Sequence, residues 1–484
     1  MAIGIMTVLG AVGATSMYYS SFSARSSNYS KTKTGTFSLA EAGINNVMSV
    51  LSNPTTNSLD PDALCPTGQH TPCSQTTTYT NGTVTWSGVL DRATAIWAVT
   101  SIGTSRNTGA SPSNVTQKLT AKVTVTPTFT QPLNNPSWNY MFATRTGNTC
   151  DETLNNNVGG GSRMYVAGNL CLGNNANLAP SALVVLGNLD VNNNASVGAA
   201  TSMATRTETY VGGWCHYGLG TTANPCTGNQ DANHIYSKKN PPSYVVGVNN
   251  VPTLLVAPAT DFPGWYENSI PGPSQSCTTT AGTPPVFDNN YPTRDNSVAT
   301  PFDLTPASSY TCYTGPVGSP TGQLSWNATT KVLTVSGTLF IDGSAKVTNS
   351  LAQYNGQAAL YLSGTFLVTG KLCGGISGAT CDFASWNPNT EMLTVVTNAT
   401  GGQVAAGDGV QLTNNASFQG ALFSNGAIDM GNNASTDGPM VGTQIILSNN
   451  VTTSAFGNIT TVPVGQPGNP EVYAQPNPPE MFSG

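Results

Sequence analysis

Ten cysteines carry the clearest chemical signal in this chain, because they occur as five close pairs along the sequence. An even number of cysteines in a chain that reads as exported is typical of disulfide bonds. A zinc site is disfavoured, since C-x₂-C spacing is absent and only His70, His216 and His234 are available. Sequence leaves the connectivity open, but loop closure favours near neighbours. We therefore expect loop-holding disulfides at Cys65–Cys73, Cys150–Cys171, Cys215–Cys226, Cys277–Cys312 and Cys373–Cys381.

Three aspartates, Asp190, Asp342 and Asp429, occupy similar positions in a repeated phrase. Two carboxyl groups that converge on one face are the machinery of glycoside hydrolysis. These three fall in different repeats, with no Arg, Lys or His beside them in a recognisable pattern, so we interpret them as solvated turn or strand carboxylates. Calcium binding at Asp-Gly turns would need a denser ligand motif. The sequence thus predicts no catalytic residue, no metal, no cofactor and no enzyme.

Two further groups of side chains have both a chemical and a packing interpretation. Cys215-His216 with His234 could form a metal or nucleophile pair, but a disulfide cysteine beside an ordinary histidine is the preferred interpretation. Four tryptophans could stack on sugars in an adhesin, although buried packing is their default role. They are Trp86, Trp97, Trp214 and Trp265.

A repeated phrase predicts the elements that hold these side chains. Short apolar strands broken by Gly, Asn-Asn or Asp-Gly recur every 17 to 21 residues, at 168–178, 187–197, 339–347, 360–368, 410–418, 428–436 and 446–452. This pattern is typical of rungs in a parallel β-solenoid, where each rung is stabilised by its neighbours. We expect a right-handed β-helix with asparagine ladders along its turns. Antiparallel hairpins at the same spacing are the alternative.

The predicted fold is mainly β with one long N-terminal α-helix, an antiparallel β module and then the parallel β-solenoid. Alternating strands with hairpin-length gaps at 78–129 predict the antiparallel sheet. The expected insertion leaves the solenoid and returns between rungs, which a rung stack tolerates. The predicted organisation is a hydrophobic helix over 1–53, the antiparallel module over 54–160, the solenoid over 161–200 and 331–463, a disulfide-bearing insertion over 201–330, and a Pro-rich extended tail over 464–484.

The helix begins with 24 residues that carry no charged side chain. About 20 such residues can span a bilayer, whereas a signal peptide would need basic residues before the apolar run. Helical spacing continues to Leu51, and Asn53-Pro54 stops it. A helix of about 50 residues, about 75 Å long, must protrude from its own small domain. We expect it to be buried among copies of itself through Ile3, Ile5, Val8, Leu9, Val12, Phe22, Glu41 and Ile44.

The apolar helix that runs into Ser38-Leu-Ala-Glu-Ala-Gly-Ile resembles the PilX-type group of type IV pilin-like proteins over about the first 55 residues. That group carries a segment of the form A-[AE]-E-A-G in this part of the helix. Its major pilins usually begin with Phe and have Glu where this chain has Ile5, which removes the usual salt bridge that sets subunit register. The resemblance implies a structural subunit of an extracellular type IV pilus-like filament, with helices in the core and the solenoid outside.

The same resemblance implies the partners. They are copies of the chain in a helical homopolymer, a type IV pilus-like assembly machinery, the inner membrane before assembly, and a surface glycan or cell receptor. Two other functions stay open: a minor or tip pilin that acts as an adhesin, and a surface-anchored β-helix enzyme that acts on glycans.

Composition supports an extracellular structural protein. Only 8% of the residues are charged, and Asn, Thr, Ser and Gly take their place. The net charge of −6 has no acidic or basic block. Nucleic acid and anionic membrane surfaces are therefore poor partner candidates.

Overall fold

The computed structural model describes residues 2–53, 58, 62–66, 72–91, 96–107, 113–128, 135–218, 224–238, 244–247, 254–269, 276–289, 293–296, 298–315, 320–454, 456–457, 459–468 and 473–483. They form two compact units, Met1–Thr128 with Tyr473–Gly484, and Phe129–Val472. The predicted fold class is confirmed: one long N-terminal helix is followed by an antiparallel sheet and then by parallel sheets. The right-handed sense of the solenoid stays a prediction.

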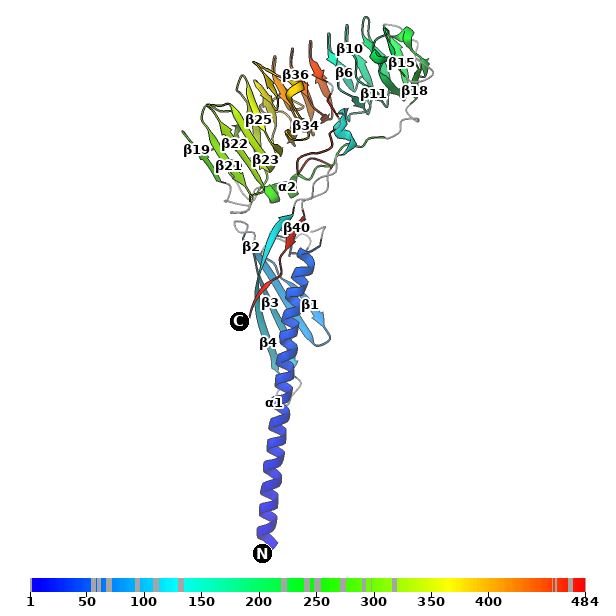
Figure 1. Ribbon diagram of the computed structural model, residues 1–484. Coiled ribbons are helices and arrows are strands. Elements are labelled where there is room, and N and C mark those ends of the chain that lie inside the picture. The colour runs from blue at the N-terminus through cyan, green and yellow to red at the C-terminus, as the bar shows by residue number, and fades with distance from the viewer. Residues whose placement is uncertain are drawn as a thin grey trace. The chain divides into compact units, whose positions relative to one another are not determined.

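In the first unit, α1 (Ala2–Leu51) is a single helix of 50 residues. Its C-terminal part packs on the sheet of this unit, while its N-terminal part extends beyond the sheet (Figure 1). The side chains turned to the sheet are small or aliphatic and buried, among them Ala40, Ile44, Val47 and Leu51. A side chain at Gly103 would collide with the backbone of Thr36 and Ala40. The glycine thus permits close contact between helix and sheet.

The sheet of the first unit is antiparallel and has six strands: β1 (Gln75–Tyr79), β2 (Gly82–Asp91), β3 (Ile96–Asn107), β4 (Ser113–Thr128), β40 (Tyr473–Pro476) and β41 (Glu480–Ser483). Strands β1 to β4 pair in sequence order. The last two strands pair with β4, which corrects the expected extended tail. Pro476 ends β40 and Pro478 and Pro479 lie between the two strands, so these prolines do not interrupt the pairing.

The second unit is a stack of three-strand rungs whose strands form three parallel columns (Figure 1). The first column is β23 (Val332–Ile341), β26 (Gln357–Leu362), β31 (Met392–Thr397), β34 (Ala421–Ser424), β37 (Met440–Gly442), β5 (Met141–Ala143), β8 (Met164–Val166), β11 (Ala182–Val185), β14 (Glu208–Val211) and β18 (Tyr244–Gly247).

The second column is β20 (Val298–Asp303), β24 (Gly343–Val347), β27 (Phe366–Val368), β32 (Asp408–Leu412), β35 (Ala427–Met430), β38 (Ile445–Leu447), β6 (Glu152–Leu154), β9 (Leu170–Leu172), β12 (Leu189–Val191) and β15 (Trp214–Tyr217). The third is β25 (Ala352–Asn355), β28 (Lys371–Cys373), β33 (Ser417–Gln419), β36 (Ser435–Asp437), β39 (Thr452–Ser454), β7 (Gly159–Gly160), β10 (Asn177–Leu178) and β13 (Ser196–Val197).

The stacking order departs from chain order at one place, which we call the seam. There the rung at 440–454 lies against the rung at 141–160, with Met440 paired to Met141 and Leu447 to Leu154. The chain therefore enters the stack in its middle and builds rungs to one end. It then crosses to the opposite end and builds back to the seam.

The seam corrects two expected boundaries. Residues 141–160, which we expected in the antiparallel module, form a parallel rung instead. The loop between β5 and β6 separates the strands of this rung, so the repeated phrase cannot be recognised there in the sequence. The segment 201–330 does not return to the rung that it leaves. It supplies β14, β15 and β18 at one end of the stack and β20 at the other.

Both ends of the stack carry antiparallel strands. At one end these are β19 (Ser276–Thr279), β21 (Tyr310–Thr314) and β22 (Gly322–Asn327), which continue onto β23. At the other end β16 (Asn224–Pro225) and β17 (Gly228–Asn229) pair with β15 and β18. Such caps limit further parallel stacking at the exposed edges.

Asparagine-rich turns set the repeat. The second turn residue has a positive φ of 57° to 64°, at Asn157, Asn175, Asn194, Asn415, Asn433 and Asn450, a conformation that asparagine tolerates better than most residues. Side-chain oxygens accept hydrogen bonds from the next rung: Asn414 Oδ1 accepts from the N–H of Asn432 at 2.9 Å, and Asn432 Oδ1 accepts from the N–H of Asn449 at 3.1 Å. The expected asparagine ladders are thus present.

The outer face of the first column is apolar and covered. Nine directly paired residues line it and are at most 6% exposed: Phe340, Tyr361, Val396, Phe423, Val441, Phe142, Tyr165, Val184 and Tyr210. We call them the outer apolar column. Its cover is made by α2 (Phe262–Ser269) and by residues 254–261, 456–457 and 459–468. The segment that crosses between the two ends of the stack and the segment that follows the last rung thus cover this column together.

All ten cysteines form disulfides, and the pairs are the five near neighbours: Cys65–Cys73, Cys150–Cys171, Cys215–Cys226, Cys277–Cys312 and Cys373–Cys381. Within the described part of the chain, we find no helix long and apolar enough to cross a membrane.

Candidate functional site

The N-terminal part of α1 presents large apolar side chains to solvent. Leu9, Val12 and Phe22 are 65%, 59% and 64% exposed. Met6, Met17, Tyr18 and Tyr19 are between 73% and 78% exposed. Ile3, Ile5 and Val8 belong to the same helix, and their side chains lie outside the described part of the structure. Nothing in the described part of the first unit covers this surface.

These seven exposed side chains point to all sides of the helix. At about 100° per residue, no gap between neighbouring directions exceeds about 100°. An amphipathic helix that lies on one surface would instead gather them on a single face. The arrangement is that of a helix enclosed by several neighbours.

Four serine and threonine hydroxyl groups in this part of α1 are bonded within the helix. Thr15 Oγ1 donates to the carbonyl oxygen of Ala11 at 2.8 Å, and Ser16 Oγ donates to that of Gly13 at 3.0 Å. Ser20 and Ser21 donate in the same way to the carbonyls of Met17 and Tyr18. Because these groups need no water as a partner, the helix can enter a dry environment without leaving them unpaired.

Two other predicted assembly residues lie further along the helix. Glu41 is half-buried. Ile44 is only 1% exposed and packs in the core of the first unit with Trp86 and Val99. The expected role of Ile44 in contacts between subunits is therefore wrong, since its side chain is already used to hold α1 on its own sheet.

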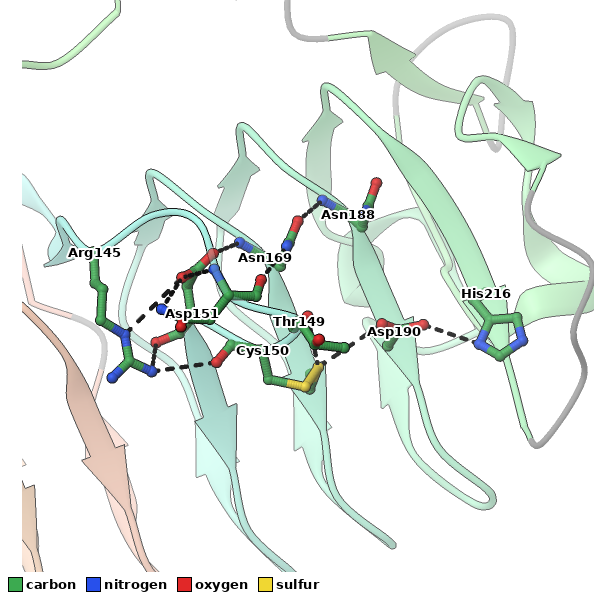
Figure 2. The surroundings of a disulfide bond; sticks show 10 residues. Arg145, Thr149, Cys150, Asp151, Asn169, Asn188, Asp190 and His216 are labelled. Atoms are coloured by element: carbon green, nitrogen blue, oxygen red, sulfur yellow. Dashed lines mark hydrogen bonds and ion pairs between the residues drawn. A yellow bond between two sulfur atoms is a disulfide. The ribbon is translucent and has the colours of Figure 1, made fainter.

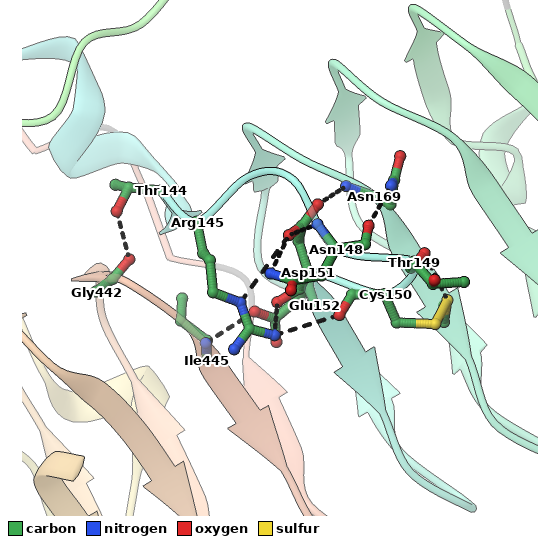
Figure 3. Close-up of polar contacts among 11 residues, drawn as sticks. Thr144, Arg145, Asn148, Thr149, Cys150, Asp151, Glu152, Asn169, Gly442 and Ile445 are labelled. Atoms are coloured by element: carbon green, nitrogen blue, oxygen red, sulfur yellow. Dashed lines mark hydrogen bonds and ion pairs between the residues drawn. A yellow bond between two sulfur atoms is a disulfide. The ribbon is translucent and has the colours of Figure 1, made fainter. Parts of the chain in front are cut away.

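A polar network occupies the seam in the second unit (Figure 3). Several hydrogen bonds cross between the two rungs, among them one from the Thr144 hydroxyl to the carbonyl of Gly442 at 3.2 Å. The N–H of Thr144 donates to the carbonyl of Gly442 at 3.0 Å, that of Arg145 donates to the carbonyl of Thr443 at 2.8 Å, and that of Ile445 donates to Glu152 Oε2 at 2.8 Å.

Asp151 organises the loop beside the seam. Its carboxylate accepts from the N–H groups of Asn148 and Asn169 at 2.9 and 2.8 Å. Burial alone would raise the pKa of Asp151, but these bonds, the Asn148 side chain and Arg145 together hold it below its usual value. Asn169 and Asn188 continue this ladder along the stack, beside the Cys150–Cys171 disulfide (Figure 2). The carboxylate thus acts as the first member of an asparagine ladder.

Glu152 is fully buried at the seam. Its Oε2 accepts the hydrogen bond from Ile445, and within the described residues Oε1 has no hydrogen-bond partner. Burial raises the pKa of Glu152 well above its ordinary value of 4.5, against the opposing effect of the Ile445 N–H. The protonated form is therefore favoured. A substrate cannot reach a carboxyl group with no exposed surface, so its role is structural.

The three candidate aspartates do not converge. Asp190 and Asp429 lie in one line along the second column but four strand spacings apart, about 19 Å. A glycosidase pair needs about 5 to 9.5 Å. Asp342 is buried and accepts from the N–H groups of Asp295 and Asn296. No pair of these carboxyl groups can act on one glycosidic bond.

The other candidates, apart from Trp214, have local packing or pairing roles. His216 Nδ1 lies 2.9 Å from Asp190 Oδ1 (Figure 2), and the ring of His234 packs on Tyr217. Trp86, Trp97 and Trp265 are buried, whereas Trp214 is 46% exposed. Within the described residues no group of three His, Cys, Asp or Glu side chains could hold a metal ion.

A hollow of about 740 Å³ lies beside β20. Prolines and small residues form most of its wall, and Asp303 is the one carboxylate in its lining. That carboxylate already accepts from the Thr348 hydroxyl at 2.7 Å and the Thr305 N–H at 2.9 Å. The lining of the hollow, as far as the structure describes it, therefore contains no pair of carboxylates.

Sequence reasoning missed Arg145, Asp151 and Glu152. The one local signal is the acidic pair Asp151-Glu152 next to Cys150. It does not reveal that Glu152 bonds to Ile445. The structure therefore leaves one extended candidate surface, the exposed part of α1.

No protein-family model matches the chain, and no curated protein matches it. Among solved structures, the chain is similar to the competence-associated pilin ComZ from Thermus thermophilus, at 13% identity and a TM-score of 0.36. The alignment covers 93% of this chain and 98% of that chain.

Proposed function

We propose that this chain is a structural subunit of an extracellular type IV pilus-like filament. The N-terminal part of α1 packs among copies of itself in the core, and the second unit belongs to the outer surface. The observation that carries the proposal is the exposed stretch of α1 from Met6 to Phe22, which is apolar on every side. A helix that is hydrophobic all round is a buried helix.

The energetics favour such burial. Covering a Leu, Val, Phe or Met side chain contributes about 1.5 to 3 kcal/mol, so the five side chains of these types on the exposed stretch contribute about 8 to 15 kcal/mol before the cost of ordering. The hydroxyls bonded within the helix oppose this only weakly. Five disulfides fit an oxidising, extracellular location.

The test compares two valines of nearly equal exposure. Val12 on α1 is 59% exposed and Val89 on β2 is 57% exposed. Val12→Asp should abolish filaments in electron micrographs of sheared cell-surface material, because it places a charge in a dry core. Val89→Asp should leave filaments intact. Normal filaments from Val12→Asp would refute the proposal.

The two alternative functions are separated from this one by simple measurements. A tip adhesin would be a trace component of sheared filaments, whereas a main subunit dominates their protein mass. A glycan-active enzyme would need a convergent carboxylate pair, and the separation of Asp190 and Asp429 disfavours it.

A further inference from the structure

The charges of α1 are few and strongly segregated. In the whole helix they are Arg25, Lys31, Lys33 and Glu41, so three cations precede a single anion. The three cations are exposed. None of the four forms an ion pair within the described residues.

The three cations, which we call the basic collar, surround the helix. At about 100° per residue they point in three directions, with the widest gap about 160°. The collar begins directly after the uncharged, apolar stretch. Parallel helices packed side by side at equal height would bring their collars together, and this repulsion opposes assembly in register.

A stagger between neighbouring helices removes the repulsion and places an anion at the collar. Glu41 lies 8 residues beyond Lys33 and 10 beyond Lys31, which corresponds to about 12 and 15 Å along the helix axis. Within one helix this separation is too large for an ion pair. Between two parallel copies shifted by the same distance, the carboxylate and an ammonium group reach equal height.

We infer that Glu41 of one copy pairs with Lys31 or Lys33 of a neighbouring copy, so that the basic collar sets the axial stagger of the assembled helices. The inference rests on the proposed function, because it needs helices packed among copies. It assigns Glu41 a positioning role between subunits. The partner is a second copy because its α1 supplies the complementary charge.

A zero-length carbodiimide cross-linker tests the pairing on native filaments. It joins a carboxyl group to an amine only when the two are in contact. Because Glu41 and either lysine are about 12 to 15 Å apart in one helix, any link between them must connect two copies. We expect mass spectrometry of treated filaments to find Glu41 linked to Lys31 or Lys33, and Glu41→Gln to remove that link.

Charge reversal provides a second readout with a matched control. Glu41→Lys should lower filament yield at least about tenfold, which corresponds to about 1.4 kcal/mol. Lys33→Glu combined with Glu41→Lys in one chain should recover most of the yield. Glu480→Lys, which reverses an exposed anion of the same unit, should have no effect.

The outcomes separate this inference from the proposed function. Filaments that depend on Val12 but lack the cross-link and tolerate Glu41→Lys would overturn the inference alone. A collar that contacts anionic lipid would give this result. A native chain that never forms filaments would overturn both.

Discussion

The outer apolar column of the second unit and the N-terminal part of α1 are both groups of large apolar side chains that lie outside the local core. In the column, Phe340 and Tyr361 are fully buried because α2 and two extended segments cover them. On α1, Leu9 and Phe22 are 65% and 64% exposed. One surface is covered by the same chain, and the other is not.

The two apolar surfaces therefore have different roles: the covered column stabilises the folded subunit, and the exposed part of α1 is available for contacts between copies. The cover of the column is anchored by specific bonds, such as that from Tyr361 Oη to the carbonyl of Gly465 at 2.7 Å. The second unit therefore buries its own apolar column. The hydrogen bonds described for side chains in the exposed part of α1 lie within the helix, so substitutions there should leave the folded subunit unchanged and affect contacts between copies.

The largest expected effect comes from a matched pair of phenylalanines. Phe340→Ala in the outer apolar column should lower the free energy of unfolding by about 3 to 5 kcal/mol, because it opens a cavity. Phe22→Ala on α1 should change it by less than about 0.5 kcal/mol, yet reduce filament yield. Denaturant unfolding monitored by circular dichroism measures the first effect, and electron microscopy the second. Equal stability losses for the two variants would remove the distinction.

A second test measures how much the seam contributes to the stability of the second unit. The pKa of Glu152 is raised in the folded state, so the folded chain binds more protons than the unfolded chain. Its contribution to stability is complete below the unfolded pKa of about 4.5 and is lost as pH rises through the folded value. Between the two values the loss is about 1.4 kcal/mol per pH unit.

Glu152→Gln isolates this effect. The amide oxygen keeps an acceptor for the Ile445 N–H but cannot ionise. Thermal unfolding from pH 4 to pH 8 should show the native chain losing stability relative to Glu152→Gln as the pH rises. A constant difference between the two proteins would mean that Glu152 does not titrate at the seam.

The smallest expected effect concerns the anchoring of the cover. The Leu255 N–H donates to Tyr165 Oη at 3.2 Å. Tyr165→Phe should lower stability by about 1 kcal/mol, since it removes one hydrogen bond. Tyr18→Phe, on the exposed part of α1, serves as the matched control and should leave the melting temperature of the subunit unchanged. If both substitutions are silent, packing alone holds the cover in place.

The features that sequence predicted are local ones. The helix, which ends at Leu51, the strand phrases and the pairing of neighbouring cysteines depend on residues that lie near one another in the chain, and local spacing reports them. The asparagine ladder is of the same kind, because each Asn-Asn turn needs a residue that tolerates positive φ.

The features that sequence missed are non-local. The pairing of Met141 with Met440 joins distant parts of the chain, and no pattern in either segment indicates that the two will pair. The partner of Glu152 was invisible for the same reason. The outer apolar column left a signal that was overlooked: Leu183-Val-Val185 has three apolar residues in succession, which is typical of a strand buried on both faces.

The seam also has a consequence for how the protein is made. Translation proceeds from the N-terminus, so the rung at 141–160 emerges long before its partner at 440–454. Until residue 454 is available, that first rung presents an unpaired strand edge, and such edges pair readily with other chains. Nascent copies made close together are thus exposed to mutual strand pairing for most of their synthesis, and the hazard ends only when the last rung closes the stack.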